Sequence, residues 1–383
     1  MRYEGKKPKV AIIYSYIPQY RWRFYEVLKD KLDKVGIELV LIYGQPSPKD
    51  SLKKDAVDLH WGRKIHNKYF TVGRWVFCWQ PVLSIIRDTD LVIVEMANKL
   101  LVNNFLLLQN SLGLKKVAFW GHGKNFQAKK TDRFSEWIKR ILSTRVHWWF
   151  AYNDTSARVV EALGFPGERV TVVQNAIDTI QLKNELENLK PEQIKQIRRE
   201  TGVTGNHIGL YIGGMYPEKR LEFLLDSLIY IREQISDFEM VFIGSGIDAS
   251  LIEDMAHRYP WIHYLGPKFN NEKVPYFAMS HLFLMPGLVG LAVIDCIALG
   301  VPLITTNGAL HSPEIEYLHS GENGVIVDSN GDTKIYAQSV INLLNNEKER
   351  LNLVEGCKIS SRQYSVENMA DNFAKGIERA LDK

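Results

Sequence analysis

The stretch MPGLVGLAVIDCIALGVPLITT occupies residues 285–306. It joins a glycine-containing loop, an apolar run of helix length and a Gly-Val-Pro turn into a β-branched segment. Such a run is typical of a buried helix between two strands of a parallel α/β sheet. Within it Asp295 is the only charged residue, and a buried carboxylate is costly unless a partner satisfies it. The stretch therefore predicts the fold class and marks Asp295 as a functional candidate.

The chain contains two series of apolar strands that alternate with helical stretches. Because strands that are apolar on both faces belong to parallel sheets, we expect an α/β protein with two Rossmann-like doubly wound domains facing each other across a cleft. The polar stretch 181–206 suits a linker with a surface helix. We predict an N-terminal domain of residues 1–180 and a C-terminal domain of residues 181–364, with a last helix at about 365–383 packing back on the first domain. The predicted strands are 9–16, 37–44, 90–96, 116–121, 147–153, 169–175, 207–214, 238–246, 262–266, 281–287, 302–306 and 324–328.

The composition is that of a soluble globular protein, with 45% hydrophobic and 24% charged residues. We find neither a signal peptide nor an uncharged apolar stretch of about 20 residues, and we therefore expect no transmembrane helix. The three cysteines, Cys78, Cys296 and Cys357, are widely spaced, which suits reduced thiols in the cytoplasm. No cluster has the spacing of metal ligands, and we expect no metal.

Charge is distributed unevenly along the chain. Residues 1–180 contain 29 Lys and Arg against 17 Asp and Glu, whereas residues 181–383 contain 19 against 27. Basic stretches mixed with aromatic residues, at 21–34 and 129–149, suit an anionic membrane surface. An ordinary core beneath a solvated basic face explains them equally well. No nucleic-acid recognition motif is present, and we expect no nucleic acid partner.

Four loops of the second half carry small residues at predicted strand ends, at 213–220, 243–246, 265–268 and 285–290. Glycine lets backbone N–H groups approach an anion, and a following helix adds its positive end. Together with a basic pair these loops predict a nucleotide-diphosphate site, although glycine at a single strand end is common in any α/β fold. The candidate donor-binding residues are Gly214, Lys219, Arg220, Gly244, Gly246, Lys268, Gly287, Leu288, Val289, Gly290 and Asp295.

Asp295, which we place two turns into its helix, has two interpretations. It could bind the ribose hydroxyls of a nucleotide, or it could be a structural residue bonded to a neighbouring Ser, Thr or backbone N–H.

Several segments, in this order, resemble the retaining GT-B glycosyltransferases of family GT4. They are VVQNAID (172–178), GGMYPEK (213–219), the 285–306 stretch and SPEIEYLHSGENGVIV (312–327). The resemblance implies a transferase that moves a sugar from a UDP- or GDP-linked donor to a hydroxyl of a saccharide or lipid-linked acceptor, in surface polysaccharide or glycolipid synthesis. It also implies that no metal is needed and that the leaving phosphate accepts the proton of the acceptor.

Three departures from the family pattern concern the donor site. The family's arginine falls on Gly214, and its paired glutamates fall on Gly287 and Asp295. We expect Lys219, with Arg220, to hold the diphosphate instead, and backbone amides at residues 288–290 to bind phosphate. The missing acid leaves the donor sugar open.

In the first half, FWGHGKNFQ (119–127) follows a predicted strand. By resemblance, His122 faces the donor sugar and is, with Lys219, the catalytic candidate; a loop histidine bonded to backbone is the alternative. The acceptor-side candidates are Pro18, Gln19, Glu95, Asn98, Lys124 and Asn125.

Two other functions remain open. A sugar-nucleotide epimerase of the same shape would act without an acceptor, and a non-catalytic partner would keep the fold and bind nucleotide weakly. For the transferase we expect a cytoplasmic location, peripheral on the inner face of the cell membrane.

Overall fold

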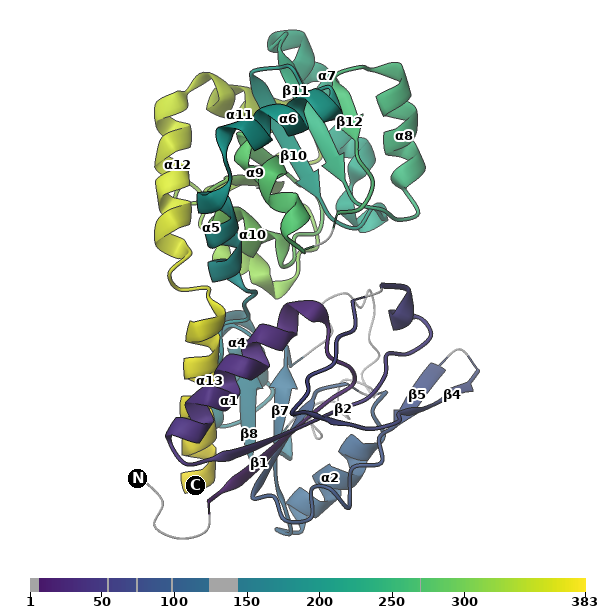
Figure 1. Cartoon of the computed structure of the whole chain (residues 1–383), viewed down its shortest axis with the longest axis vertical. Helices are drawn as coiled ribbons and strands as arrows, with labels where there is room; N and C mark the ends of the chain where they lie inside the picture. The colour runs from purple at the N-terminus through teal and green to yellow at the C-terminus, as the bar shows by residue number, and fades with distance from the viewer. Residues whose placement is uncertain (1–6, 54, 74, 98, 124–143, 269) are drawn as a thin grey trace. The chain divides into compact units, whose positions relative to one another are not determined.

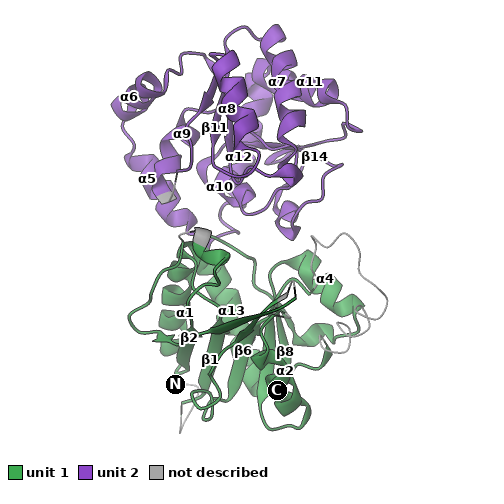
Figure 2. Ribbon diagram, turned by 90° about the vertical axis from the view of Figure 1, so that its right-hand side faces the viewer, with its two compact units in different colours: residues 1–177, 366–383 green, residues 178–365 purple. Residues whose placement is uncertain are grey.

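A computed structural model describes residues 7–53, 55–73, 75–97, 99–123, 144–268 and 270–383. The chain divides into two compact units (Figure 2), residues 1–177 with 366–383 and residues 178–365. The boundary expected from sequence was after residue 180. Within the described residues, no helix is long and apolar enough to cross a membrane.

Unit 1 is built on a seven-stranded sheet in the order β3-β2-β1-β6-β7-β8-β9, with every neighbouring pair parallel. Residues of β1 alternate between two separate apolar cores, with Ile12 in one and Ile13 in the other. The sheet is therefore covered on both faces, as the apolar runs predict. The strands are β1 Lys9–Tyr14, β2 Glu38–Tyr43, β3 Arg63–Lys64, β6 Leu91–Glu95, β7 Lys116–Gly121, β8 Trp148–Ala151 and β9 Val170–Val172.

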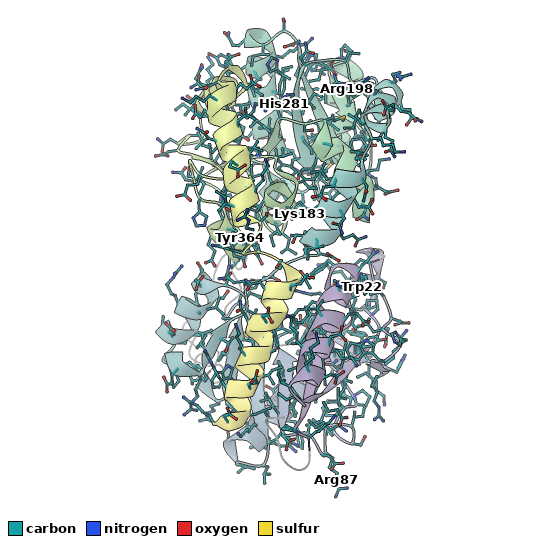
Figure 3. All side chains as sticks on the ribbon, turned by 60° about the vertical axis from the view of Figure 1, so that its left-hand side comes forward. Trp22, Arg87, Lys183, Arg198, His281 and Tyr364 are labelled. Carbon is teal, nitrogen blue, oxygen red and sulfur yellow. The ribbon has the colours of Figure 1, made fainter. Side chains whose placement is uncertain are left out.

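Helices α1 and α13 lie side by side on one face of this sheet (Figure 1) and contribute to one core. Helices α2 and α4 contribute to the core on the other face. The last helix of the chain thus packs within unit 1. The helices are η1 Gln19–Arg21, α1 Trp22–Lys34, η2 Asp50–Lys53, α2 Val102–Ser111, α4 Asp154–Ala162, η3 Gly167–Arg169 and α13 Val366–Asp382; Trp22, labelled in Figure 3, begins α1.

A separate two-stranded antiparallel sheet, β4 Lys68–Val72 with β5 Trp75–Trp79, also belongs to unit 1. Neither of its strands was predicted from the sequence. The residues of β4 are largely exposed, so this strand lacks the buried apolar run by which the other strands are recognised.

Two chain segments connect unit 1 with unit 2, and Arg21 forms hydrogen bonds to a unit-1 residue next to each of them. It is 1% exposed. Its Nη2 donates to Asn175 Oδ1 at 2.5 Å, just before the first connection, and its Nη1 donates to Met369 Sδ at 3.4 Å, just after the second. The guanidinium lies over the rings of Trp120 and Tyr152 at 5.3 and 5.4 Å. Aromatic faces therefore stabilise a buried cation that forms no ion pair with the described acids.

Unit 2 is built on a six-stranded parallel sheet in the order β12-β11-β10-β13-β14-β15. The stretch 181–206 forms much of two helices rather than one. The strands are β10 His207–Ile212, β11 Phe238–Ile243, β12 Ile262–Tyr264, β13 Leu282–Leu284, β14 Leu303–Thr306 and β15 Gly324–Val327. The helices are α5 Thr179–Asn188, α6 Pro191–Thr201, η4 Pro217–Lys219, α7 Leu221–Gln234, α8 Ala249–Arg258, η5 Asn270–Lys273, α9 Val274–Ala278, α10 Ala292–Leu299, η6 Pro313–Tyr317, α11 Thr333–Asn345 and α12 Glu347–Ser360.

The packing of α13 on the sheet of unit 1 generates a prediction at Gly376. A Cβ at this position would lie 2.7 Å from both Phe150 Cε1 and Thr171 Oγ1. Gly376→Ala should therefore force α13 away from the sheet and destabilise unit 1 by about 1–3 kcal/mol. Calorimetry should show a lower melting temperature for one transition, and Lys375→Ala, on the exposed side of α13, should leave it unchanged. An unshifted transition in Gly376→Ala would contradict this packing.

Candidate functional site

The loops that leave β10, β13 and β14 come together in unit 2, because these three parallel strands are neighbours and end at the same edge of the sheet. The amide of Leu288 donates to Glu218 O at 2.8 Å, and the amide of Ser312 donates to Val289 O at 3.0 Å. The loop after β13 is therefore held between the other two. Ligands of open α/β sheets bind at this carboxyl edge.

Gly287 lies where two backbones come into contact. A Cβ at this position would be 2.2 Å from the carbonyl carbon of Lys219 and 2.4 Å from Glu218 O. Only glycine fits without a backbone shift. The acid that the family resemblance would place here is therefore excluded by the path of the 218–219 backbone.

Lys219 is a buried cation beside this contact. Lys219 is 5% exposed, and its Nζ donates to Leu288 O at 2.5 Å. Burial lowers the pKa of Lys219 to about 8. None of the described acidic side chains forms an ion pair with it, so its charge is only partly compensated by a carbonyl dipole.

Arg220 places a second cation at the same edge. It has a positive φ of 55°, which turns the chain from η4 into α7. Its Nη1 donates to Thr306 Oγ1 at 2.9 Å, and Thr306 Oγ1 donates to Pro286 O at 2.8 Å. The guanidinium also lies 4.2 Å from the centre of the Phe223 ring. Arg220 thereby connects the loops after β10, β13 and β14.

His311 is a third basic residue of the site, and the sequence reasoning missed it. Its Nδ1 accepts from the amide of Val289 at 3.2 Å, and its Nε2 lies 2.7 Å from Thr306 O. A carbonyl only accepts, so the proton is on Nε2 and the ring is neutral. Burial lowers the pKa of His311, the bond to the Thr306 carbonyl opposes this, and the charges of Lys219 and Arg220 lower it further. His311 thus positions the loop without adding a charge.

The backbone amides expected to bind phosphate are only partly available. The amides of Leu288 and Val289 donate to Glu218 O and His311 Nδ1. No described residue accepts a hydrogen bond from the amide of Gly290. We expected the amides of residues 288–290 to bind phosphate. In this structure that prediction is wrong for Leu288 and Val289, because their amides form hydrogen bonds that hold the loop in place.

The glycines after β10 and β11 allow the backbones of the two loops to come into contact. A Cβ at Gly244 would lie 1.9 Å from Gly213 O, and one at Gly246 would lie 2.0 Å from Met215 O. Gly214 accepts through its carbonyl from Tyr211 Oη at 2.8 Å. These glycines bring two loops together, so no contact with a ligand is needed to explain them. Lys268 follows β12 and is half-buried.

Asp295 lies in the first turn of α10 rather than two turns into its helix, because α10 begins at Ala292. Its Oδ1 forms an ion pair with Lys273 Nζ at 2.5 Å. The two side chains are 15% and 18% exposed. The neighbouring Ser, Thr or backbone N–H considered from sequence alone is therefore not the partner that compensates this charge. Lys273, at the end of η5, does so.

His122 follows β7 in unit 1 and is held by a short chain of hydrogen bonds. Its Nδ1 lies 3.1 Å from Ser156 Oγ, and Ser156 Oγ lies 2.6 Å from Asn153 Oδ1. Asn153 Oδ1 also accepts from the Ser156 amide, so the hydroxyl must donate to Asn153 and accept from His122. This fixes a proton on Nδ1, so that Nε2 is the acceptor nitrogen when the ring is neutral. The imidazole also packs on Tyr152, with ring centres 4.4 Å apart.

The other acceptor-side candidates differ in their surroundings. Glu95 accepts from Ser15 Oγ at 3.0 Å, and burial raises the pKa of its carboxyl. Pro18 precedes η1, and the amide of Gln19 donates to Asp55 O at 2.7 Å. Asn98, Lys124 and Asn125 lie outside the described residues.

The described part of unit 2 thus gathers Lys219, Arg220 and His311 around one loop, with no acid paired to the two cations. Such an arrangement can bind an anion and stabilise negative charge that develops on it. None of the described residues forms a group of three or more His, Cys, Asp or Glu side chains that could hold a metal ion.

The part of the chain that contains this site matches a known protein family. Residues 206–346 match the family Glycosyl transferases group 1. An uncharacterized glycosyltransferase of Methanocaldococcus jannaschii is 27% identical over 215 residues, which is 52% of this chain and 58% of that protein. The chain spans little more than half the length of the curated relatives that it matches.

Solved structures resemble the chain over nearly its whole length. Anabaena HepE in complex with UDP has a TM-score of 0.72 at 14% identity and covers 97% of this chain and 99% of its own. A putative UDP-N-acetylglucosamine 2-epimerase from Listeria monocytogenes has a TM-score of 0.66 at 13% identity and covers 97% and 96%. At these identities the likeness concerns the fold, which is GT-B as expected from sequence.

The neutral state of His311 generates a prediction about pH. A histidine whose folded pKa is lowered adds stability that is present above pH of about 6.5 and is lost as the pH falls towards the folded pKa. Unit 2 should therefore be less stable at pH 5.5 than at pH 7.5, and His311→Gln should reduce that difference in urea unfolding.

His281 provides the control, because burial also lowers its pKa, to about 4. Part of the pH dependence should therefore survive in His311→Gln. An unchanged pH dependence in the variant would show that His311 is not held neutral by the loop.

Proposed function

We propose that this chain, which has the GT-B fold and carries a group 1 glycosyltransferase region at residues 206–346, transfers a sugar from a nucleotide-diphosphate sugar to a hydroxyl group. The reaction retains the anomeric configuration, as in family GT4. The acceptor is a saccharide or a lipid-linked saccharide in surface polysaccharide or glycolipid synthesis, and the protein works at the inner face of the cell membrane.

The observation that carries this proposal is the buried, acid-free ammonium of Lys219. Burying an ammonium without a counter-charge is costly, and burial already lowers its pKa to about 8. A diphosphate would supply the missing negative charge beside Lys219 and Arg220. The leaving group of a nucleotide sugar becomes more negative as the sugar departs, and a preorganised cation then stabilises the transition state more than the ground state.

The nucleoside would be held by Asp295. Lys273 forms an ion pair with this carboxylate close to the loop end of α10. Two ribose hydroxyls could donate to its oxygens while the ion pair persists, because a carboxylate has several acceptor sites. UDP and GDP present the same ribose and diphosphate to these residues.

The donor sugar must be recognised without an acid at position 287. The backbone at Glu218 and Lys219 fills the space in which that side chain would lie. Sugar hydroxyls would therefore meet backbone groups of this loop, such as the amide of Gly290. His122, whose Nε2 is an acceptor, is the candidate in unit 1 for the sugar's reacting end, and the leaving phosphate takes the acceptor's proton.

An epimerase is the second candidate, since a protein named as a putative epimerase shares the fold. It would convert a nucleotide sugar in the absence of any acceptor. Product analysis by NMR with and without acceptor separates the two activities. Conversion without an acceptor would replace the transferase proposal, and binding of nucleotide without any conversion would favour a non-catalytic partner.

The low pKa of Lys219 leads to a prediction about affinity. Binding of a diphosphate should raise this pKa, so that UDP or GDP takes up about half a proton at pH 8, and the affinity should fall by up to about tenfold per pH unit above pH 8. Calorimetry in buffers of different ionisation enthalpy measures the uptake directly.

Two variants test the same group. Lys219→Met should remove the proton uptake and lower kcat/KM by about 100-fold or more, as expected for a lost charge partner in the transition state. Lys219→Arg keeps the charge at every pH and should remove the uptake alone while retaining part of the affinity. Proton uptake that persists in Lys219→Met would assign it to another group.

A separate prediction concerns Asp295. Asp295→Ala should weaken UDP or GDP binding by about tenfold, because two hydrogen bonds to a charged acceptor are lost, and it should leave inorganic diphosphate binding within about twofold. The comparison of the two ligands in one calorimeter is the measurement. Equal losses for both ligands would mean that the Lys273–Asp295 pair only supports the loop.

A further inference from the structure

Residues 59–87 form a stretch of unit 1 in which every charged residue is basic. They contain no Asp or Glu, and they combine five basic with six aromatic residues. The basic residues are Arg63, Lys64, Lys68, Arg74 and Arg87, of which Lys64 pairs with Asp58 at 2.7 Å and Arg74 lies outside the described residues. The aromatic residues are Trp61, Tyr69, Phe70, Trp75, Phe77 and Trp79. The β4–β5 hairpin lies at the centre of this stretch.

The hairpin exposes apolar side chains that a free domain would be expected to bury. Phe70 is 43% exposed, Val72 is 60% exposed and Val76 is 45% exposed. Lys68, Phe70 and Val72 alternate along β4 and so lie on one face of the hairpin. Phe70 stacks on Phe77 across the strands, with ring centres 6.0 Å apart. Figure 1 shows the hairpin extending away from the seven-stranded sheet.

Hydrogen bonds to neighbouring segments hold the base of the hairpin in place. Tyr69 Oη donates to Gln45 O at 2.9 Å. The amide of Cys78 donates to Lys99 O at 2.8 Å, and the amide of Leu101 donates to Cys78 O at 3.0 Å. A rigid base presents the apolar face at little cost in conformational entropy on binding.

We propose that the β4–β5 hairpin inserts its Phe70 and Val72 face into the boundary between headgroups and acyl chains of a membrane that contains anionic lipids. Lys68 on the same face, with the neighbouring basic residues, would lie against the phosphate groups. This deepens the proposed function, on which it rests for the lipid-linked acceptor, by naming the element that holds the protein at the membrane.

Charge and side-chain type favour lipid over two other occupants. A second copy of the chain would bring the same cationic hairpin against itself, which like charges oppose. Single-stranded nucleic acid is bound on flat aromatic platforms, whereas the most exposed apolar residue of this face is Val72, which suits an acyl boundary.

The basic face of α1, where sequence alone placed the membrane contact, is less suitable. Three of its cations are paired with acids: Lys29 with Asp33 at 2.7 Å, Lys31 with Asp371 at 2.6 Å and Arg23 with Glu367 at 3.9 Å. The other stretch proposed from sequence, 129–149, lies mostly outside the described residues.

Vesicle co-sedimentation tests the proposal with the full chain. Wild type should bind vesicles of phosphatidylcholine with phosphatidylglycerol far better than vesicles of phosphatidylcholine alone, and added salt should weaken binding. Phe70→Ser combined with Val72→Ser should reduce binding to the mixed vesicles by about tenfold or more, since both apolar side chains are lost. Lys68→Glu should reduce it by several-fold.

The matched control is Leu108→Ser combined with Leu112→Ser on α2, where the two leucines are 57% and 63% exposed. This variant should bind vesicles as wild type does. Melting temperature and calorimetric UDP binding of all variants should also equal those of wild type, which separates loss of membrane contact from loss of the fold or of the donor site.

Three results would overturn the proposal. They are hairpin variants that bind vesicles as well as wild type, an α2 variant that loses binding instead, and a wild type whose hairpin mediates self-association or oligonucleotide binding with no binding to vesicles. Vesicle binding in a protein that binds no nucleotide would leave this inference standing while the proposed function fails.

Discussion

The close contact between the backbone at Gly287 and the backbone of Glu218 and Lys219 is the constraint on which the candidate site depends. With a Cβ at position 287, the two loops could not approach to the distance at which Leu288 bonds to Glu218 O. That approach in turn buries Lys219 against Leu288 O and places Arg220 within reach of Thr306. One glycine thus determines where two cations lie, and it excludes an acid from position 287 itself.

Lys273 and Lys219, two lysines of unit 2 near this loop, differ in how their charges are compensated. Lys273 and Asp295 form an ion pair in which each charge compensates the other. Lys219 is more deeply buried, and its ammonium has a carbonyl, a thioether and the Tyr216 ring as neighbours but no paired acid among the described residues. Burial consequently lowers its pKa. A bound anion should therefore stabilise the charge of Lys219 more than that of Lys273. For Lys273 the ion pair with Asp295 already offsets the cost of desolvation, whereas for Lys219 the anion would do so.

Sequence reasoning located nearly all strands of the two large sheets, since parallel strands are buried on both faces and appear as apolar runs. It also brought Lys219, Arg220 and the 287–290 loop to one edge. It failed where the meaning of a residue depends on a distant contact. His311 was overlooked because its partner, Val289, lies in another loop, and Asp295 was assigned no lysine because Lys273 precedes it by a whole strand. Gly244 and Gly246 were assigned to a ligand because glycine marks close approach to any backbone, here that of residues 213–215.

The lowered pKa of Lys219 bears on whether the departures from the family pattern weaken catalysis. A lysine that is already fully charged and paired stabilises substrate and transition state almost equally, which adds little to the rate. The Lys219 ammonium lies in a site where burial disfavours its charge, so its interaction with a phosphate strengthens as negative charge builds on the leaving group. Arg220, fixed to Thr306 and the Phe223 ring, provides a constant positive charge beside it. In the proposed function, Lys219 and Arg220 would therefore replace the arginine that is missing at Gly214, one as a responsive and one as a permanent cation, whereas the acid missing at Gly287 has no side-chain substitute.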